Sequence, residues 1–263
     1  MYFKDKVVWI IGASSGIGKE LAIQLDQKGA KLVLSGRKVE ALNTLQTMLQ
    51  NPSNHLVLSL DLAKSEDAEL NAAKVIAHFG KIDMLFNNGG LSQRSTAVET
   101  QLAVDRYIME VNYFGNIAYT KAVLPYFIQQ KSGHIIVISS IAGKFGFFLR
   151  SAYSASKHAL LGFYESLLLE QESNQIFVTI ACPGKINTEI SMNALQADGK
   201  AHGVMDHNQA TGMPVELCVS KLLRATENKK KEVLIGGKEL FAVHLKRWFP
   251  SLFWKIIRKQ SAV

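Results

Sequence analysis

The sequence predicts an α/β protein with a doubly wound fold, in which a seven-stranded parallel sheet carries helices on both faces. Short apolar runs rich in β-branched residues alternate with longer segments of helical composition from residue 6 to residue 237, an order typical of parallel sheets. A glycine-rich turn separates the first strand from the first helix, where such sheets bind a dinucleotide. We expect a dinucleotide-binding and catalytic domain over residues 1–237, and a basic aromatic tail over residues 238–263 that packs on the same domain or faces a membrane.

The elements follow one another without a repeat, a low-complexity tract or a clear domain boundary. Strands are expected at residues 6–11, 31–35, 55–62, 83–86, 134–140, 176–184 and 232–237. Helices are expected at residues 19–29, 39–50, 65–80, 151–172 and 214–226, together with a long helix that contains residues 111–115. The long connection over residues 190–213 has small, polar and methionine residues, which is typical of a mobile lid.

Composition places the chain among soluble globular proteins. Hydrophobic residues make up 48% and charged residues 20% of its 263 residues, as in ordinary soluble domains. The two cysteines, Cys182 and Cys218, form no CxxC pair, so reduced thiols and a cytoplasmic protein are expected. The seven histidines show no ligand spacing, and we expect no metal site. No apolar run reaches the ~18 residues that a membrane span needs.

The turn GASSGIG indicates a site for the pyrophosphate of a dinucleotide. Its residues are Gly12, Ala13, Ser14, Ser15, Gly16, Ile17 and Gly18. Glycines allow backbone geometries and close approaches that a side chain would block, and the N-terminus of the following helix attracts a phosphate. A Walker loop is disfavoured, because five residues separate Gly12 from Gly18 and Glu20 stands where that loop requires Ser or Thr.

The second strand ends in Ser35-Gly36-Arg37-Lys38, which predicts a preference for NADP(H). An enzyme that uses NAD usually carries an acidic residue here to bind the adenosine ribose hydroxyls. This chain has two cations and no carboxylate at the position. Arg37 could bind a 2′-phosphate through a forked, charge-assisted contact. The alternative is that Arg37 and Lys38 are solvated loop charges.

Ser140, Tyr153 and Lys157 are the candidate catalytic residues. Ser140 ends the apolar run HIIVISS, and the other two lie in a segment of helical composition. Residues four apart share one helix face, so the phenol and the ammonium can converge on one point. A nearby cation lowers the pKa of a phenol from its ordinary ~10, which makes the pair a tunable acid, and Ser140 can hydrogen-bond the same substrate atom. Taken alone, a Tyr and a Lys at this spacing could be a chance arrangement.

Polar residues at other strand ends and in the long helix have both a functional and an ordinary reading. Asp61 could accept from an adenine amino group, with the Leu62 backbone beside it, or could cap the next helix. Asn87-Asn88-Gly89-Gly90 forms a tight polar turn where backbone must approach another group closely. Asn112 has poor propensity for a helix interior and can divert the backbone or bind water, or it is a tolerated surface residue.

Together these residues resemble the short-chain dehydrogenase/reductase family, in its single-domain type with a TGxxxGxG entry and a YxxxK core. The resemblance covers roughly residues 4–237 with the strand and helix order matching. It implies a catalytic group of Asn112, Ser140, Tyr153 and Lys157. The cofactor contacts expected from the residues and from the resemblance are Gly12, Ser14, Ser15, Gly16, Ile17, Gly18, Ser35, Arg37, Lys38, Asp61, Leu62, Asn88, Gly89, Gly90, Tyr153, Lys157, Pro183, Gly184, Ile186 and Thr188.

The resemblance implies an NADP(H)-dependent oxidoreductase that interconverts a carbonyl and an alcohol, such as a carbonyl reductase, and that forms a homodimer or homotetramer. Tyr153 would protonate the carbonyl oxygen while Ser140 polarises it. Lys157 would bind the nicotinamide ribose hydroxyls and lower the pKa of Tyr153. Asn112 would hold a water in the proton relay. The alternative is a non-catalytic NADP-binding regulator on the same fold, which would be expected to lack Tyr153 or Lys157.

Three positions depart from the family pattern without touching the catalytic group. Ile11 replaces the usual Thr, which removes a hydroxyl that would tie the glycine turn down. Gly89 replaces the usual Ala, and Lys185 adds a charge after Pro183-Gly184. These departures bear on the fine geometry of the cofactor rather than on activity.

Positive charge and aromatic residues are concentrated in the tail. Residues 228–263 hold nine Lys and Arg against two acids, whereas residues 1–227 hold 21 against 20. Pro250 divides the stretch from Phe241 to Lys259 into two short amphipathic pieces. This pattern suits the surface of an anionic membrane and favours a lipophilic substrate, while nucleic acid is not expected because the rest of the chain offers no basic groove. Alternatively, the aromatic residues cover the substrate pocket or a subunit interface.

Overall fold

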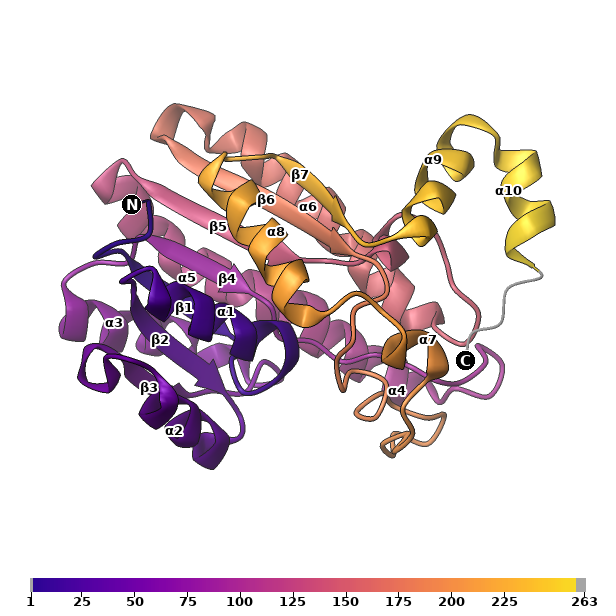
Figure 1. The fold of residues 1–263 in the computed structure, drawn as a ribbon, viewed down its shortest axis with the longest axis horizontal. Helices are drawn as coiled ribbons and strands as arrows, with labels where there is room; N and C mark the ends of the chain where they lie inside the picture. Colours follow the sequence, from indigo (N-terminus) through magenta and orange to yellow (C-terminus); the bar gives the residue numbers. More distant parts are fainter. Residues whose placement is uncertain (1, 259–263) are drawn as a thin grey trace.

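The computed structural model describes residues 2–258 and contains a seven-stranded sheet whose neighbouring strands are all parallel. The strands are β1 Val7–Ile11, β2 Lys31–Gly36, β3 Leu56–Ser59, β4 Met84–Asn87, β5 Gly133–Ile138, β6 Ile176–Pro183 and β7 Glu232–Ile235. Their order across the sheet is β3-β2-β1-β4-β5-β6-β7 (Figure 1). The predicted doubly wound Rossmann fold is therefore confirmed.

The central strands are buried throughout because helices cover both faces of the sheet. Every residue of β1, β4 and β5 is buried, whereas a strand with one solvated face would alternate. The helices are α1 Gly16–Gln27, α2 Val39–Met48, α3 Ala68–Phe79, α4 Leu102–Met109, α5 Gly115–Gln130, α6 Ser151–Glu170, α7 His207–Ala210, α8 Val215–Glu227, α9 Phe241–Trp248 and α10 Pro250–Ile257.

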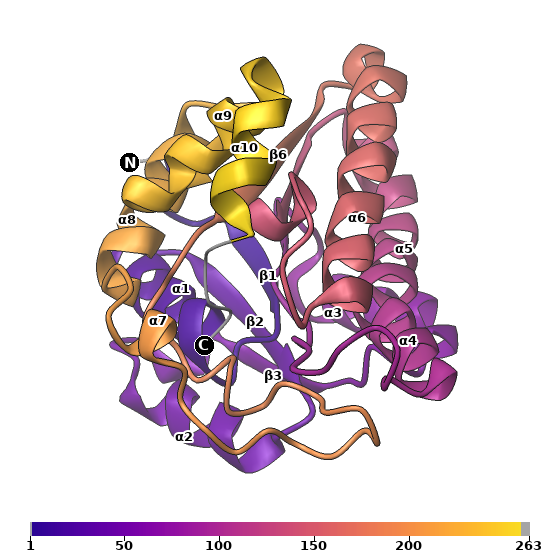
Figure 2. The same ribbon diagram turned by 90° about the vertical axis from the view of Figure 1, so that its right-hand side faces the viewer.

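The two faces of the sheet belong to two separate hydrophobic cores. Val8 and Ile10 of β1 pack with residues of α1, α2 and α8. Val7, Trp9 and Ile11 of the same strand pack with residues of α3, α5 and α6. The two sets alternate because successive side chains of a strand point to opposite faces. Figure 2 shows α1 and α8 on one side of the sheet and α5 and α6 on the other.

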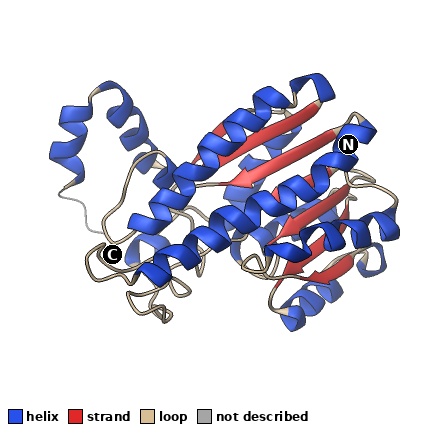
Figure 3. Cartoon of the chain, turned by 180° about the vertical axis from the view of Figure 1, so that it is seen from behind, coloured by secondary structure: helices blue, strands red, loops and turns tan. Residues whose placement is uncertain are grey.

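The strand order places a binding site between β1 and β4. The chain runs outward from β1 through β2 to β3 and then crosses back to β4 on the other side of β1. The helix after β1, α1, packs on one face of the sheet and α5, after β4, packs on the other. Figure 3 shows the sheet with its covering helices from behind. A ligand of a doubly wound sheet binds at the carboxyl ends of the strands beside such a reversal.

Two elements differ from the expectation in a way that affects the site. The strand expected over residues 55–62 is ordered only over Leu56–Ser59, a half-exposed strand at the edge of the sheet. Residues 60–62 leave the ladder and are free to line the cleft. The long helix is divided into α4 and α5 by a π-helical turn over Glu110–Phe114, a form that often occurs at functional sites, and Asn112 lies inside that turn.

The tail forms two helices, α9 and α10, that project at one end of the molecule (Figure 1). Leu245 and Phe253 are buried and pack on Ile141 and Phe145, directly after Ser140. The ring centroids of Phe145 and Phe253 are 5.1 Å apart. Lys259, the end of the predicted aromatic stretch, lies outside the described residues. Within residues 2–258, none of the helices combines the length and the apolar character that crossing a membrane requires.

Candidate active site

The glycine-rich turn between β1 and α1 has the close approaches that its glycines predict. Gly12 and Gly16 have φ angles of +84° and +51°, in the left-handed region that side chains disfavour. A Cβ atom on Gly18 would lie 1.9 Å from the carbonyl oxygen of Gly12, so no larger residue fits there. The turn thus brings bare backbone to the N-terminus of α1, where a pyrophosphate is expected.

Asn88, the residue directly after β4, binds the glycine-rich turn. Its Nδ2 donates to the Gly12 carbonyl at 2.9 Å, which supplies a tie where Ile11 has no hydroxyl. The departure at Gly89 also has a physical reason. A Cβ atom there would lie 2.6 Å from Cδ1 of Leu62, so the leucine side chain occupies the space that an alanine methyl would need.

A cleft of about 500 Å³ runs along the carboxyl ends of β1, β2 and β4. The predicted cofactor residues that line it are Gly12, Ser14, Ser15, Gly16, Ile17, Arg37, Lys38, Asp61, Leu62, Asn88, Gly89, Gly90 and Thr188. Ser35 does not line the cleft, because its buried hydroxyl accepts from the Trp9 indole at 2.9 Å. Its carbonyl instead accepts from the amides of Gly12 and Ala13, so Ser35 supports the turn from below.

The two groups predicted to meet the adenosine lie along this cleft. Arg37 and Lys38 are exposed, and Arg37 Nη1 donates to the Tyr107 hydroxyl at 3.4 Å. Asp61 lines the cleft and also accepts from the Ala63 amide at 3.1 Å. Asp61 therefore caps the turn after β3, although the nearest α-helix, α3, begins only at Ala68.

A second cavity of about 110 Å³ shares Asn88, Gly90 and Thr188 with the cleft. Ser140, Tyr153 and Lys157 line this cavity together, as the sequence predicts. The predicted loop after β6 also reaches it through Pro183, Gly184, Ile186 and Thr188. The cleft and the cavity are joined by lining residues that they share, and the glycine turn fits the pyrophosphate of a dinucleotide cofactor.

Burial is the main influence on the pKa values of Tyr153 and Lys157, the candidate catalytic pair. Lys157 Nζ donates to the Ile138 carbonyl at 2.8 Å and lies 5.8 Å from the Tyr153 ring centroid. Burial lowers the pKa of Lys157 to about 8. Burial also raises the pKa of Tyr153, against the opposing influence of the Ser140 hydroxyl and of nearby arginine side chains. This direction differs from the lowering expected at the sequence level, because desolvation of the phenolate outweighs the cations.

Asn112 acts on the backbone rather than lining either cavity. Its side chain accepts from the Leu91 amide at 2.7 Å and donates to the Leu91 carbonyl at 2.9 Å. It also donates to Ser156 Oγ, one turn from Tyr153. The side chain thereby joins the turn after β4 to the catalytic helix. The water-holding role stays a prediction.

Several residues of the site carry no signal in the sequence. Gln93 is buried, and its Oε1 accepts from the Ala152 amide at 2.8 Å at the start of α6. Arg94 and Arg150 line the catalytic cavity, and both contact Asp206. These partners are 56 to 112 residues apart in the chain, and no local spacing relates them.

Glu239 connects the tail to the loop after β6. Its Oε1 accepts from the Lys185 and Gly237 amides, each at 3.0 Å. A Cβ atom on Gly184 would lie 2.3 Å from the same oxygen, so glycine is required for this contact. The tail expected over residues 238–263 is therefore joined by Glu239 to the loop after β6.

The glycine turn, the cleft and the Ser140, Tyr153 and Lys157 cavity define an oxidoreductase that binds a nicotinamide dinucleotide. The family model described as short chain dehydrogenase matches residues 6–199. The chain belongs to the short-chain dehydrogenase/reductase family, as its motifs predict.

Curated relatives and solved structures agree with this assignment. "Dehydrogenase/reductase SDR family member 7B" of Mus musculus is 41% identical over 266 residues, covering 99% of this chain and 82% of that protein. "Dehydrogenase/reductase SDR family protein 7-like" of Drosophila melanogaster is 37% identical, covering 97% and 80%. A short-chain dehydrogenase from Streptomyces avermitilis has a TM-score of 0.83 at 28% identity, covering 99% and 100%. A family member from Burkholderia phymatum in complex with NAD has a TM-score of 0.84 at 22% identity over 96% of both chains, which shows the fold alone.

Proposed function

We propose that the protein is an NADP(H)-dependent reductase or dehydrogenase that interconverts a lipophilic ketone or aldehyde and its alcohol. The observation that carries the proposal is the meeting of Ser140, Tyr153 and Lys157 in one cavity that opens onto the cofactor cleft. A bound nicotinamide supplies the hydride in reduction and accepts it in oxidation. Free, buried cysteines at positions 182 and 218 support a reducing, cytoplasmic setting, which fractionation of cells would test.

The residues divide the proton chemistry among them. In reduction, Tyr153 donates its hydroxyl proton to the carbonyl oxygen, and the Ser140 hydroxyl hydrogen-bonds the same oxygen. Lys157 stands behind the phenol, where its ammonium stabilises the phenolate left after proton transfer. Its Nζ would also bind the nicotinamide ribose. In oxidation the phenolate takes the alcohol proton back.

The test is a screen that follows NADPH absorbance with lipophilic ketones and aldehydes, and NADP⁺ with the matching alcohols. Turnover with members of either set is the expected result. NADPH binding without turnover on any of them would instead favour the non-catalytic regulator. Sedimentation of the same preparation would test the proposed homodimer or homotetramer.

The cofactor preference is proposed from Arg37. Its guanidinium is exposed at the cleft. Its two neighbours in the chain, Gly36 and Lys38, are not acidic, so no carboxylate next to it in the sequence would repel a 2′-phosphate. We expect NADP(H) to bind at least ~10-fold tighter than NAD(H), and Arg37→Asp to abolish or reverse that ratio. The measurement is a fluorescence titration of both reduced cofactors. Lys31→Asp is the matched control, because Lys31 is an exposed cation at the opposite end of β2. Equal affinities in the wild type would rule the assignment out.

The tail surface supports contact with an anionic membrane, from which a lipophilic substrate would come. We define this surface as Phe241, Trp248, Phe249, Leu252 and Trp254, all exposed, together with Arg247, Lys255 and Arg258, which are exposed cations of the same two helices and the residue after them. Phe241 and Trp248 are seven residues apart on α9 and share one face. Phe253 and Leu245 pack inward on Ile141 and Phe145, in the segment that follows Ser140, so the tail helices are attached next to the candidate catalytic residues.

We expect the protein to co-sediment with phosphatidylserine-containing vesicles, more strongly with more anionic lipid and less strongly with added salt. Each basic residue near the surface contributes ~1 kcal/mol of binding. Trp248→Ser with Trp254→Ser should release the protein, whereas Leu169→Ser, an exposed apolar change on α6, should not. Point variants are preferable to removal of the tail, which would also remove Glu239 from the Lys185 loop. If the wild type ignores such vesicles, the surface belongs to a subunit contact or to the substrate pocket.

A further inference from the structure

The connection over residues 190–213, here called the lid segment, is folded back on itself. The Asp206 amide donates to Ser191 Oγ at 3.2 Å, and the Gly203 and His202 amides donate to the carbonyls of Met192 and Ala194. Leu195 is paired with Gln93 on one side and Ala201 on the other. The lid segment is therefore one flap, and its position relative to the active site depends on a few contacts.

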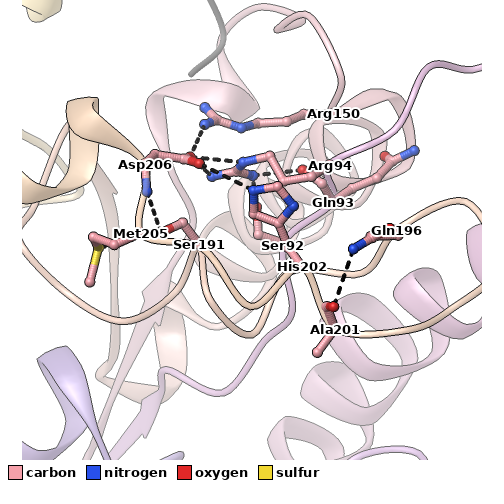
Figure 4. Close-up of polar contacts among 10 residues, drawn as sticks. All are labelled: Ser92, Gln93, Arg94, Arg150, Ser191, Gln196, Ala201, His202, Met205 and Asp206. Carbon is pink, nitrogen blue, oxygen red and sulfur yellow. Dashed lines mark hydrogen bonds and ion pairs between the residues drawn. The ribbon is translucent and has the colours of Figure 1, made fainter.

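The strongest of these contacts is a buried ion pair between Arg94 and Asp206 (Figure 4). Both Nε and Nη2 of Arg94 donate to Asp206 Oδ2, the former at 2.8 Å. The side chains are 2% and 1% exposed, so neither charge is solvated. Arg150 Nη2 lies 3.4 Å from the same oxygen, and His202 Nε2 lies 3.7 Å from Oδ1.

The residue before Arg94 is attached to the catalytic helix. Gln93 Oε1 accepts from the amides of Ala152 and Tyr153 at 2.8 Å and 3.4 Å. Its Nε2 donates to Thr100 at 3.0 Å and more weakly to Ser151. Two adjacent residues thus join the flap, through Asp206, to the first turn of α6, which carries Tyr153.

We propose that the Arg94–Asp206 ion pair is a latch that holds the lid segment across the catalytic cavity in register with Tyr153. The two residues are positioning residues for substrate, and the proposal rests on the proposed function for what the cavity binds. Arg94 and Arg150 line the cavity from the latch side, as Ile190 and Gln209 do from the lid side. Arg94 is therefore shared between the flap and the substrate wall.

The cofactor side of the flap has an independent anchor. The Arg94 amide donates to the Leu195 carbonyl at 2.8 Å, and the Leu195 amide donates to the Ser92 carbonyl at 2.9 Å. These bonds join backbone groups only and do not involve the Asp206 side chain. Loss of the latch should therefore loosen the part of the flap around Asp206 and weaken substrate binding much more than cofactor binding.

The test compares Asp206→Asn with Asp198→Asn in the full-length protein. Asp198 lies in the same segment, but its carboxylate is exposed and contacts only Lys200 among the described residues. In Asp206→Asn, amide hydrogen exchange in residues 202–210 should become at least ~10-fold faster, while NADPH affinity changes less than ~3-fold. With a substrate from the screen, KM should rise at least ~5-fold and kcat change less than KM, the pattern of lost binding that is equally strong in the ground state and the transition state.

A double variant guards against misfolding, since removal of one partner leaves the other charge buried and uncompensated. Arg94→Met with Asp206→Leu removes both charges of the buried pair, and Arg150, the second cation at Asp206, has a side chain that is 17% exposed and can be solvated. The double variant should therefore fold, yet should still show the faster exchange and the higher KM. If the pair acts as a unit, its effects should also be smaller than the sum of the single variants' effects. Unchanged exchange in residues 202–210, or an unchanged KM in a folded variant, would overturn the latch. If the screen yields no substrate, the exchange measurement decides alone, so failure of the latch and failure of the proposed function remain distinguishable.

Discussion

Replacing Tyr153 with phenylalanine is expected to lower turnover at least ~100-fold while the fold and the cofactor affinity are retained. A positioned general acid contributes ~10²–10⁴-fold to a rate, and Tyr153 is the phenol that lines the catalytic cavity. Burial raises its pKa, so the hydroxyl holds its proton at neutral pH and is ready to donate it in reduction. In oxidation the same burial opposes formation of the phenolate, so the rate should rise with pH.

The variant is measured by NADPH-coupled turnover, NADPH titration and thermal unfolding. Tyr126→Phe is the matched control, because Tyr126 lies on α5 and lines neither the cleft nor the catalytic cavity. Turnover of Tyr153→Phe near that of the wild type, with a good substrate, would remove Tyr153 from its assigned role.

The parts of the site that the sequence predicts are those built from neighbouring residues. Gly12, Gly16 and Gly18 act within one turn, and Tyr153 and Lys157 within one turn of a helix, so their spacing already expresses their geometry. The parallel arrangement of the strands follows from the alternation of strands and helices, because a crossover between parallel strands needs an intervening helix. Arg37 lines the cleft because it directly follows a strand whose carboxyl end borders that cleft, whereas its preference for NADP(H) stays a prediction.

The rest of the site depends on contacts between distant residues. Asp206 meets Arg94 across 112 positions, and Glu239 meets Lys185 across 54. The sequence pattern around an Asp or a Gln does not show whether its side chain is buried in a contact or exposed to solvent. The buried Ser35 hydroxyl likewise bonds to Trp9 of the neighbouring strand, and Asn112 in the π-helical turn bonds to Leu91 and Ser156, 21 and 44 positions away.

Lys157→Met is expected to make the cofactor-free protein more stable at neutral pH while lowering turnover at least ~100-fold. Lys157 is fully buried, and its pKa falls from the ordinary 10.5 to about 8 because burial penalises the ammonium. The unfolded chain therefore binds this proton up to a higher pH than the folded chain does. Below pH ~8 the folded protein carries the whole free-energy penalty of burying the ammonium. This penalty is about 3 kcal/mol, because each tenfold change in the acid dissociation constant of Lys157 corresponds to ~1.4 kcal/mol.

As pH rises from about 8 to 10.5, the unfolded chain holds more protons than the folded one, so the penalty disappears and wild-type stability gains relative to the variant. Loss of the bond from Nζ to the Ile138 carbonyl offsets part of the gain, leaving an advantage of ~1–3 kcal/mol at pH 7. Urea unfolding of both proteins without cofactor, at pH 7 and at pH 10, measures this difference, and groups shared by the two proteins cancel. The expectation is wrong if the variant has a lower free energy of unfolding than the wild type at pH 7, or if its advantage is the same at pH 7 and pH 10. Either result would show that burial of the Lys157 ammonium does not destabilise the folded protein.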